Sequence, residues 1–300
     1  MHCIAYCNLT LCRSATSRLH GQFANGLVLT FVEGAALASC LELASDQIMR
    51  LVTLELATWH SPPITEAHLA ASTAPMVFQR SRQWTSKVPD RASKAGATEK
   101  LLAAGLTKAA LGAELDQLEA LVAPLRSPVV FCHNDALAFN FIMQPDGALL
   151  LCDVEYGGYN YRGFDVGNHW CEWTGFELDI TRFPDVDQQR LWCQYYLEAA
   201  RASAIDAAAP NANTSIEALR REGQFFTLMS ELFWIAWALL QAEVSEIDFD
   251  YVQYAIDRWV RYGVRKPAVL ADVTAPLDPT LDAELVNAPV ATDSIIDDDG

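Results

Sequence analysis

The chain has 300 residues and a formal net charge of −17, from 38 acidic and 21 basic side chains. This charge argues against a nucleic-acid backbone or an anionic membrane surface as a partner, because both are bound through clustered Lys and Arg. Apolar residues make up 51% of the chain, which is enough for a substantial core and more than one subdomain.

The chain reads as a cytoplasmic protein without stable membrane insertion. Residues 1–18 lack the basic start and the continuous apolar run of a secretory signal. The longest apolar run elsewhere, 232–240, is about half the length needed to cross a bilayer. The eight cysteines are scattered without the C-x₂-C spacing of a zinc site, so no metal is assigned to them. Reduced thiols suit a cytosolic protein.

The first half of the chain predicts a strand, a helix and a long connection. The strand covers 27–32 and ends at Gly34. Asp46 is expected to cap a helix, because apolar residues then follow three-and-four spacing as far as Trp59. Residues 81–108 are polar, Ala-rich and weakly periodic, which favours a mobile connection with a short helix.

The second half predicts mainly helices. A helix over 112–122 stops before Pro124, and the strands described below follow it. Gly263 is expected to end the last helix. Beyond it, an acidic segment with several prolines and no helical periodicity predicts disorder. The helices expected after the strands cover 164–173, 187–202, 215–244 and 249–262.

Polar residues punctuate short apolar runs in the centre of the chain. Asp135 follows the apolar run 129–131. Asn140 and Asp153 flank two further apolar runs that are joined by an Asp-Gly turn at 146–147. Because a hairpin brings the outer ends of its strands together, Asn140 and Asp153 are expected to meet, with Asp135 beside them.

This pattern suits phosphoryl transfer. The transferred group is highly charged, so the protein contributes positioning and charge neutralisation through Mg²⁺. Mg²⁺ prefers oxygen ligands, which makes Asn140 and Asp153 candidate metal ligands. Asp135 is placed to orient a substrate hydroxyl and accept its proton. No Ser-His-Asp or paired-histidine motif supports the alternative of a metal-dependent hydrolase.

Four strings resemble the choline/ethanolamine kinase family. HNDALAFN is similar to its HNDLxxxN motif, and DVEYGGYNYRGFDVGNHWCEW to its D(F/Y)EYAxYNxxxFDIxNHFxE block. LHGQFANGLVLTFVEGAAL resembles the end of its N-lobe and the hinge, and ELFWIAWALLQAEVSEIDFDYVQYAIDRW its C-terminal segment with paired tryptophans. The resemblance covers 19–265. Ala136 departs from it, because the family usually has Leu there.

The resemblance implies an α+β, protein-kinase-like fold of the aminoglycoside/choline kinase type, with a mostly helical C-lobe and a truncated N-lobe. Its expected division is an N-lobe remnant with hinge over 1–34, the C-lobe with the catalytic and substrate sites over 35–268, and the acidic tail over 269–300. Such enzymes anchor ATP with a glycine-rich hairpin and a strand lysine. Neither device is present, because the first lysine is Lys87 and the only glycines before Gly34 are Gly21 and Gly26.

The resemblance also implies ATP- and Mg²⁺-dependent phosphorylation of a small amino alcohol. Asp135 would be the base within a catalytic set that includes His133 and Asn140, and Asn140 and Asp153 would hold the metal. Glu155 would order the site or neutralise a cationic substrate. These roles rest on the family's motifs.

Ethanolamine is the expected substrate. Its phosphorylation to phosphoethanolamine is the first step of the CDP-ethanolamine route to phosphatidylethanolamine. The strings NGLVLTFVEGAAL, EWTGFELDITRFPD and SEIDFDYVQYAIDRW look closer to ethanolamine kinases. Choline kinase activity is the alternative. Trp234 and Trp237 share a helix face, and Tyr156 and Tyr254 could complete an aromatic cage for the quaternary ammonium of choline. The same aromatics equally fit core packing.

A non-catalytic relative that serves as a binding or dimer-partner module is the remaining alternative, given the absent lysine and glycine loop. A homodimer is left open. Three neighbours of the motifs carry smaller expectations. Asp165 should hydrogen-bond the backbone near His133, and His169 should be a core histidine. Arg162 pairs with an acidic group or approaches phosphate.

Overall fold

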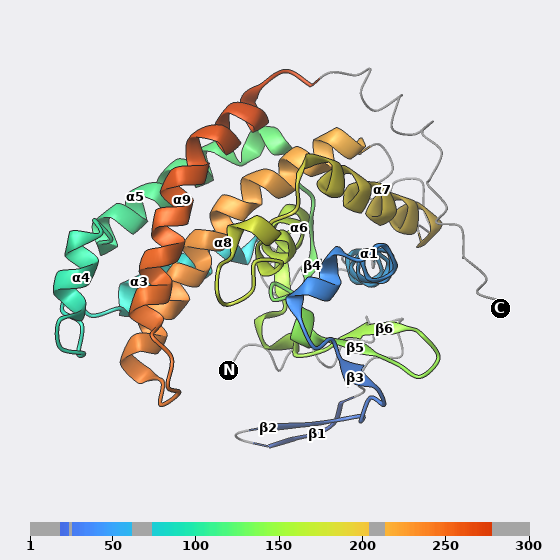
Figure 1. Ribbon diagram of the computed structural model, residues 1–300, viewed down its shortest axis with the longest axis horizontal. Coiled ribbons are helices and arrows are strands. Elements are labelled where there is room, and N and C mark those ends of the chain that lie inside the picture. Colours follow the sequence, from blue (N-terminus) through green and yellow to red (C-terminus); the bar gives the residue numbers. More distant parts are fainter. Residues whose placement is uncertain (1–18, 24–25, 62–73, 204–213, 278–300) are drawn as a thin grey trace, which may run out of the picture.

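The computed structural model describes residues 19–23, 26–61, 74–203 and 214–277, and every structural statement below concerns these residues. The expectations for residues 1–18 and for most of the acidic tail lie outside them. Figure 1 shows a body of helices with small sheets along one side. This arrangement agrees with the α+β class expected from the sequence.

Three small antiparallel sheets occupy the strand side of the molecule (Figure 1). The first is a separate hairpin, the second joins Ala35–Ala36 to the central hairpin, and the third contains the strand that leads into the loop carrying Asp135. The strands are β1 (Leu19–Phe23) with β2 (Gly26–Leu29), β3 (Ala35–Ala36) with β5 (Phe141–Met143) and β6 (Leu149–Leu151), and β4 (Val129–Cys132) with β7 (Gly158–Tyr161).

The helices pack around α8, which is buried along most of its length. α9, α6 and α3 lie against it. The helices are α1 (Asp46–His60), α3 (Met76–Lys87), α4 (Ala97–Ala103), α5 (Lys108–Leu121), α6 (Arg162–Glu172), α7 (Val186–Ser203), α8 (Ile216–Val244) and α9 (Tyr251–Thr274). In the described part of the chain, α8 alone is long and apolar enough to cross a membrane, but 83% of its most apolar window is buried inside the protein. A helix covered on all sides in this way is a core helix.

Helices α6 and α8 approach closely because glycines lie at their contact. A Cβ added at Gly167 would stand 2.5 Å from the carbonyl oxygen of Gly223, and one added at Gly223 would stand 2.6 Å from the Trp170 ring. These distances are shorter than van der Waals contact, and the first is to rigid backbone. The close approach positions α6, which carries Asp165 and Glu172.

We expect Gly167→Ala to lower the free energy of unfolding by about 1–3 kcal/mol, because overpacking outweighs the gain in helix propensity. Gly112→Ala in α5 is the matched control, since a Cβ there meets nothing within 4 Å. That control should raise the free energy of unfolding by about 0.5–1 kcal/mol. Urea unfolding measures both, and a stabilised Gly167→Ala protein would contradict the tight contact.

The N-terminal predictions are partly right. β2 covers only the first part of the expected strand 27–32, and the chain leaves the sheet after Leu29. Ser45, rather than Asp46, caps α1, because its hydroxyl accepts a hydrogen bond from the Ile48 amide. Asp46 lies in the first turn, where its carboxylate accepts from Arg50.

The connection with a short helix predicted for 81–108 is partly right. α4 (Ala97–Ala103) is the short helix, but α3 runs on to Lys87, so two helices occupy about half of this stretch. α3 buries Phe78 and Trp84 in the core around α8, where Trp84 lies 4.6 Å from Phe233 between ring centroids. The polar residues between these positions hide the periodicity in the sequence.

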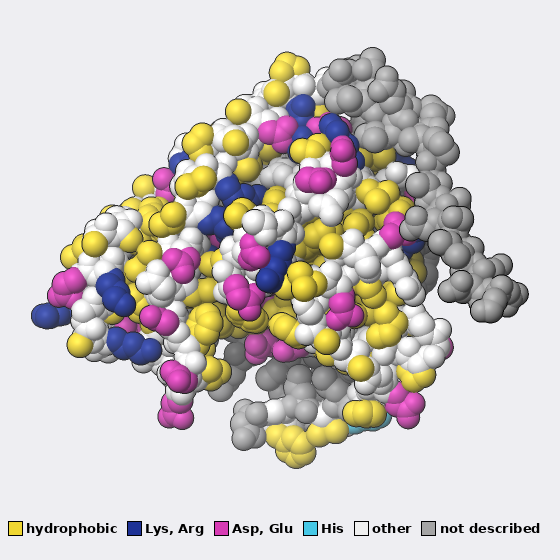
Figure 2. Space-filling view, in the orientation of Figure 1, with side chains coloured by type: hydrophobic (Ala, Val, Ile, Leu, Met, Phe, Trp, Pro, Cys, Tyr) yellow, Lys and Arg dark blue, Asp and Glu magenta, His cyan; other side chains and the backbone are white. Residues whose placement is uncertain are grey.

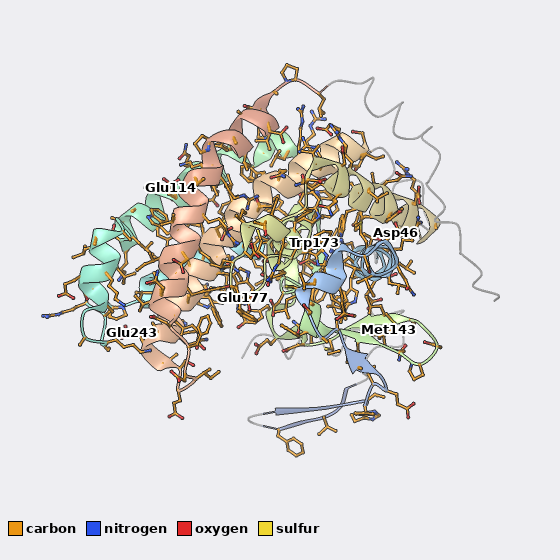
Figure 3. The ribbon with its side chains drawn as sticks, in the orientation of Figure 1. Asp46, Glu114, Met143, Trp173, Glu177 and Glu243 are labelled. Atoms are coloured by element: carbon orange, nitrogen blue, oxygen red, sulfur yellow. The ribbon has the colours of Figure 1, made fainter. Side chains whose placement is uncertain are left out.

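The predicted end of the last helix at Gly263 is also wrong. α9 continues to Thr274, so the first six residues of the expected tail, 269–274, are helical. Pro267 lies inside α9, where it cannot donate a backbone hydrogen bond to the carbonyl of Gly263. Beyond Gly263, Lys266 pairs with Glu114, which lies between α5 and α9 in Figure 3. The helices predicted over 112–122, 164–173, 187–202 and 215–244 are confirmed within a few residues.

Candidate active site

The central hairpin brings Asn140 and Asp153 to one end, as the sequence predicts. β5 and β6 pair with Phe141 opposite Leu151, and the turn at 146–147 joins them. The Cys152 amide donates to the Asn140 carbonyl at 2.8 Å, which extends the ladder by one step. Asp153 therefore follows directly after the residue paired with Asn140.

Asn140 ties Asp135 to this end of the hairpin. Its side-chain nitrogen donates to the Asp135 carbonyl oxygen at 2.8 Å and to the Asp135 carboxylate at 3.2 Å. The amide nitrogen is thus committed to Asp135, and the amide oxygen is the atom that Asn140 could offer to a cation. Asp135, Asn140 and Asp153 come together in one site.

Asp153 adopts a left-handed backbone conformation, with φ of 63°. Asp and Asn enter this region more readily than other side chains that carry a Cβ. The conformation ends β6 and starts the short turn that carries Glu155 and Tyr156. Both Asp153 and Glu155 are exposed, so their carboxylates face solvent at the mouth of the site.

Asp135 lies in a strongly acidic environment. Its side chain is mostly buried, with 7% exposed, and burial raises the pKa of its carboxyl well above the usual range. The negative charges of Glu172, Asp153 and Glu155 raise this pKa further, and the hydrogen bond from Asn140 opposes them. Figure 2 shows acidic side chains at several places on this face, including the lower edge of the helical body. Such a cluster favours the binding of cations.

Asp165 on α6 holds the catalytic loop, as expected. Its two carboxylate oxygens accept from the His133 amide at 2.7 Å and the Asn134 amide at 2.6 Å. His60 of α1 contacts the same carboxylate at 3.0 Å and the Tyr196 hydroxyl at 2.7 Å. Burial raises the pKa of Asp165, but His60, His133 and the Asn134 amide together outweigh burial, so the pKa is lowered.

His60, Cys132 and Asp165 place three potential metal-ligating atoms within 4.8 Å of one another. The imidazole and the carboxylate are already hydrogen-bonded to each other and to the surrounding groups just described. The Cys132 thiol donates toward the Tyr161 carbonyl at 3.4 Å. This cluster is therefore a buried brace for the loop.

His133 lies beside the site with its side chain turned into the protein. The ring is fully buried, and its Nε2–H donates to the Cys152 carbonyl at 2.8 Å. Burial also lowers the pKa of His133, which favours the neutral ring. His133 thereby links the loop that carries Asp135 to the hairpin, and its membership in the catalytic set stays a prediction.

Of the four aromatic residues predicted to form a cage, three lie in one cluster and the fourth lies farther along a chain of ring contacts. Trp234 lies 5.5 Å from Trp237 and 5.4 Å from Tyr156 between ring centroids. The Trp237 indole donates to the Tyr156 hydroxyl at 2.9 Å. Tyr254 packs instead on Phe249 at 5.4 Å, so it reaches the cluster through neighbouring rings. Three of the four predicted cage residues thus lie together.

Glu172 is a candidate site residue that sequence reasoning missed. It ends α6, and its negative charge raises the pKa of Asp135 more than any other neighbouring charge does. The signal was present, because Glu172 closes the NHWCE string that matches the family block. Its position beside Asp135 depends on how α6 packs.

The two open expectations on α6 are settled by the structure. Arg162 is buried and pairs with Glu222 through both Nε and Nη2, so it does not face a phosphate site. His169 donates through Nδ1 to the Ala136 carbonyl at 2.8 Å and accepts from the Trp173 indole at 3.2 Å. Burial lowers its pKa to about 4, as fits a neutral core histidine.

Comparison with known proteins agrees with this geometry. The choline/ethanolamine kinase family matches residues 5–263. Mouse ethanolamine kinase 2 is 36% identical over 258 residues, which cover 85% of this chain and 62% of the mouse protein. A probable ethanolamine kinase of Arabidopsis thaliana is 30% identical over 269 residues, covering 88% of this chain and 68% of the plant protein.

Solved structures show the same fold. Ethanolamine kinase of Plasmodium vivax superimposes with a TM-score of 0.72 at 22% identity, covering 86% of this chain and 69% of that one. Choline kinase of Cryptosporidium parvum superimposes with a TM-score of 0.66 at 20% identity, covering 94% and 80%.

The chain spans about 62% of the length of the mouse enzyme that it matches. The family match over 5–263 contains Asp135, the central hairpin and helix α8. These agreements in sequence and architecture place the chain in the choline/ethanolamine kinase family, with its protein-kinase-like fold.

Proposed function

We propose that this protein transfers the γ-phosphoryl group of ATP to the hydroxyl of ethanolamine and releases phosphoethanolamine and ADP. The observation that carries the proposal is the meeting of Asp135, Asn140 and Asp153 at one end of the central hairpin. In the cell, this reaction would open the CDP-ethanolamine route to phosphatidylethanolamine. The curated relatives named ethanolamine kinase in mouse and Arabidopsis support the assignment.

Each residue of the site has a distinct part in this reaction. The substrate oxygen forms a bond to the γ-phosphorus as the bond to the leaving ADP oxygen breaks, and Asp135 takes the hydroxyl proton. Asn140 holds the Asp135 carboxylate in place. Asn140 and Asp153 offer the oxygen ligands that fit Mg²⁺. When bound, Mg²⁺ supplies neutralisation of phosphate charge.

The acidic side chains of the site would bind the ammonium group of the substrate. A primary ammonium is bound best by carboxylate acceptors. Glu172 and Glu155 both act electrostatically on Asp135, so they lie close enough to neutralise a cation whose hydroxyl reaches Asp135. We propose Glu172 as the main ammonium ligand, because it is the more buried of the two and loses less to solvent screening.

Choline kinase activity is the second candidate. The cluster of Tyr156, Trp234 and Trp237 favours it, because quaternary ammonium groups bind over aromatic faces. The indole of Trp234 and the hydroxyl of Tyr156 are used in hydrogen bonds within the protein. Only the ring faces of Trp234 and Tyr156 are therefore left to bind a quaternary ammonium group.

The test is an assay with ATP, Mg²⁺ and either ethanolamine or choline. The 300-residue chain is compared with the same chain extended at its N-terminus by the corresponding part of mouse ethanolamine kinase 2. We expect phosphoethanolamine to form, with kcat/KM for ethanolamine above that for choline. A higher value for choline would favour the second candidate. No product and no calorimetric binding of either amino alcohol, in either form, would reject both activities and leave the non-catalytic module.

The acidic surroundings of Asp135 predict a shift in pH dependence. Asp135 must be ionised to accept a proton, so its pKa sets the acidic limb of the kcat profile. Glu155→Gln removes a negative charge that raises this pKa, so the pKa falls and the acidic limb should move to lower pH. Asp146→Asn, in the exposed hairpin turn, is the control and should leave the limb in place. A shift to higher pH in Glu155→Gln would contradict Asp135 as the base.

A further inference from the structure

A buried ionic cluster joins α8 and α9 beneath the candidate site. At its centre is Glu231 of α8, which is fully buried. Three arginines of α9 surround this carboxylate, and burying a charge is costly unless such partners compensate it. They are Arg258 at 3.1 Å, Arg261 at 2.7 Å and Arg265 at 3.7 Å. One carboxylate and three guanidiniums leave an excess of positive charge under an acidic site.

Arg258 differs from the other two arginines in what else it contacts. Its Nη2 lies 3.6 Å from the Glu172 carboxylate, and its guanidinium carbon lies 4.8 Å from the centre of the Tyr254 ring. Arg261 donates instead to the Thr174 hydroxyl. Arg265 donates to the Thr227 hydroxyl and stacks on the Phe183 ring.

The planar fork of Arg258 makes this double engagement feasible. One arm donates to Glu231 and the other faces Glu172, while the flat face covers Tyr254. A guanidinium holds such fixed directions, whereas a lysine ammonium is a single point charge. Arg258 is 1% exposed, so solvent does not screen these interactions. The residue is therefore a rigid link from the core to Glu172 and Tyr254.

The charge of Arg258 also affects the ionisation of Glu172. Burial raises the pKa of Glu172, and Glu231 raises it further, while Arg258 and Arg261 lower it. Loss of Arg258 would thus favour a neutral Glu172, which binds an ammonium group less well.

We propose that Arg258 is a positioning residue for the amino-alcohol substrate, which orients Glu172 and Tyr254 without touching the substrate itself. This inference rests on the proposed function and deepens it. It predicts that Arg258 controls the affinity for ethanolamine and has little effect on the affinity for ATP, since its contacts lead to the ammonium side of the site.

The test compares Arg258→Gln with Arg265→Gln. Both variants remove one positive charge from around Glu231, but within the described residues Arg265 contacts neither Glu172 nor Tyr254. We expect Arg258→Gln to raise KM for ethanolamine about tenfold or more and to leave KM for ATP unchanged. Arg265→Gln should leave both KM values close to those of the parent protein.

A double-mutant cycle with Glu172→Gln gives a second measurement. The effects of Arg258→Gln and Glu172→Gln on the ethanolamine KM should be non-additive, because the two side chains act as a unit. Arg265→Gln and Glu172→Gln should be additive. Additive effects in both cycles would overturn the link between Arg258 and Glu172.

Arg258→Lys keeps the inference testable if the Gln variant does not fold. Lysine retains a charge for Glu231 but lacks the fork that also faces Glu172. We expect a folded protein with a raised ethanolamine KM, and an unchanged KM in an active, folded variant would overturn the inference. If the unsubstituted protein neither phosphorylates nor binds ethanolamine, the proposed function fails and the inference falls with it.

Discussion

Replacing Asp135 with Asn should lower kcat for ethanolamine phosphorylation by about 10²–10⁴-fold, the usual contribution of a positioned general base. The amide keeps the shape of the side chain and can still accept the hydrogen bond from Asn140, but it cannot take a proton. KM for ATP should change little, because the substitution acts on the alcohol. Steady-state kinetics at saturating Mg²⁺ measure the loss, and a near-normal kcat would refute the role of Asp135 as base.

The same substitution should make the protein more stable at neutral pH. The carboxyl pKa of Asp135 is raised in the folded protein, so folding favours the protonated form. Stability from this group is therefore present below the unfolded pKa of 3.8 and is lost as the pH rises through the folded value. Asn removes that loss, so its Tm should exceed that of the parent at neutral pH.

Two conditions separate this effect from a general gain in stability. At a pH below 3.8 the two proteins should have the same Tm, because Asp135 is protonated in both folded and unfolded states. Adding Mg²⁺ at neutral pH should narrow the difference, because a cation relieves the repulsion among the carboxylates. A difference that is independent of pH would show that the charge of Asp135 is not its cause.

Asp153→Asn should lower kcat by roughly 10²-fold or more at ordinary Mg²⁺ concentration. Asp153 is the one carboxylate among the proposed Mg²⁺ ligands, so its loss should weaken the charge stabilisation that the bound metal would supply, an effect of several kcal/mol. Asn is the suitable replacement, because it tolerates the left-handed conformation of this position. Asp153→Ala would add backbone strain of about 1–2 kcal/mol to the loss of the ligand.

The Mg²⁺ dependence of the rate distinguishes the proposed role of Asp153 from a structural one. Asp153→Asn should need a higher Mg²⁺ concentration for half-maximal rate and should keep the Tm of the parent within a few degrees. Asp146→Asn at the hairpin turn is the control, since this residue shares the hairpin but lies at its other end. An unchanged Mg²⁺ requirement in Asp153→Asn would assign the metal to other residues.

The sequence alone determined the parts of this protein that depend on short-range spacing. Helix periodicity located α5, α6, α7 and α8, and the Asp-Gly turn fixed the register of the central hairpin. That register placed Asn140 beside Asp153, because a hairpin allows little freedom between its strand ends. The motif around Asp135 then indicated phosphoryl transfer and the family.

The tertiary structure decided what depends on contacts between distant segments. It made α3 helical by burying Phe78 and Trp84 against α8, and it carried α9 past Gly263. It also brought the charge of Glu172 within reach of Asp135 and placed Arg258 Nη2 3.6 Å from the Glu172 carboxylate. No local pattern encodes these placements, because they follow from how α6, α8 and α9 share one core, and burial there outweighs the propensities of single residues.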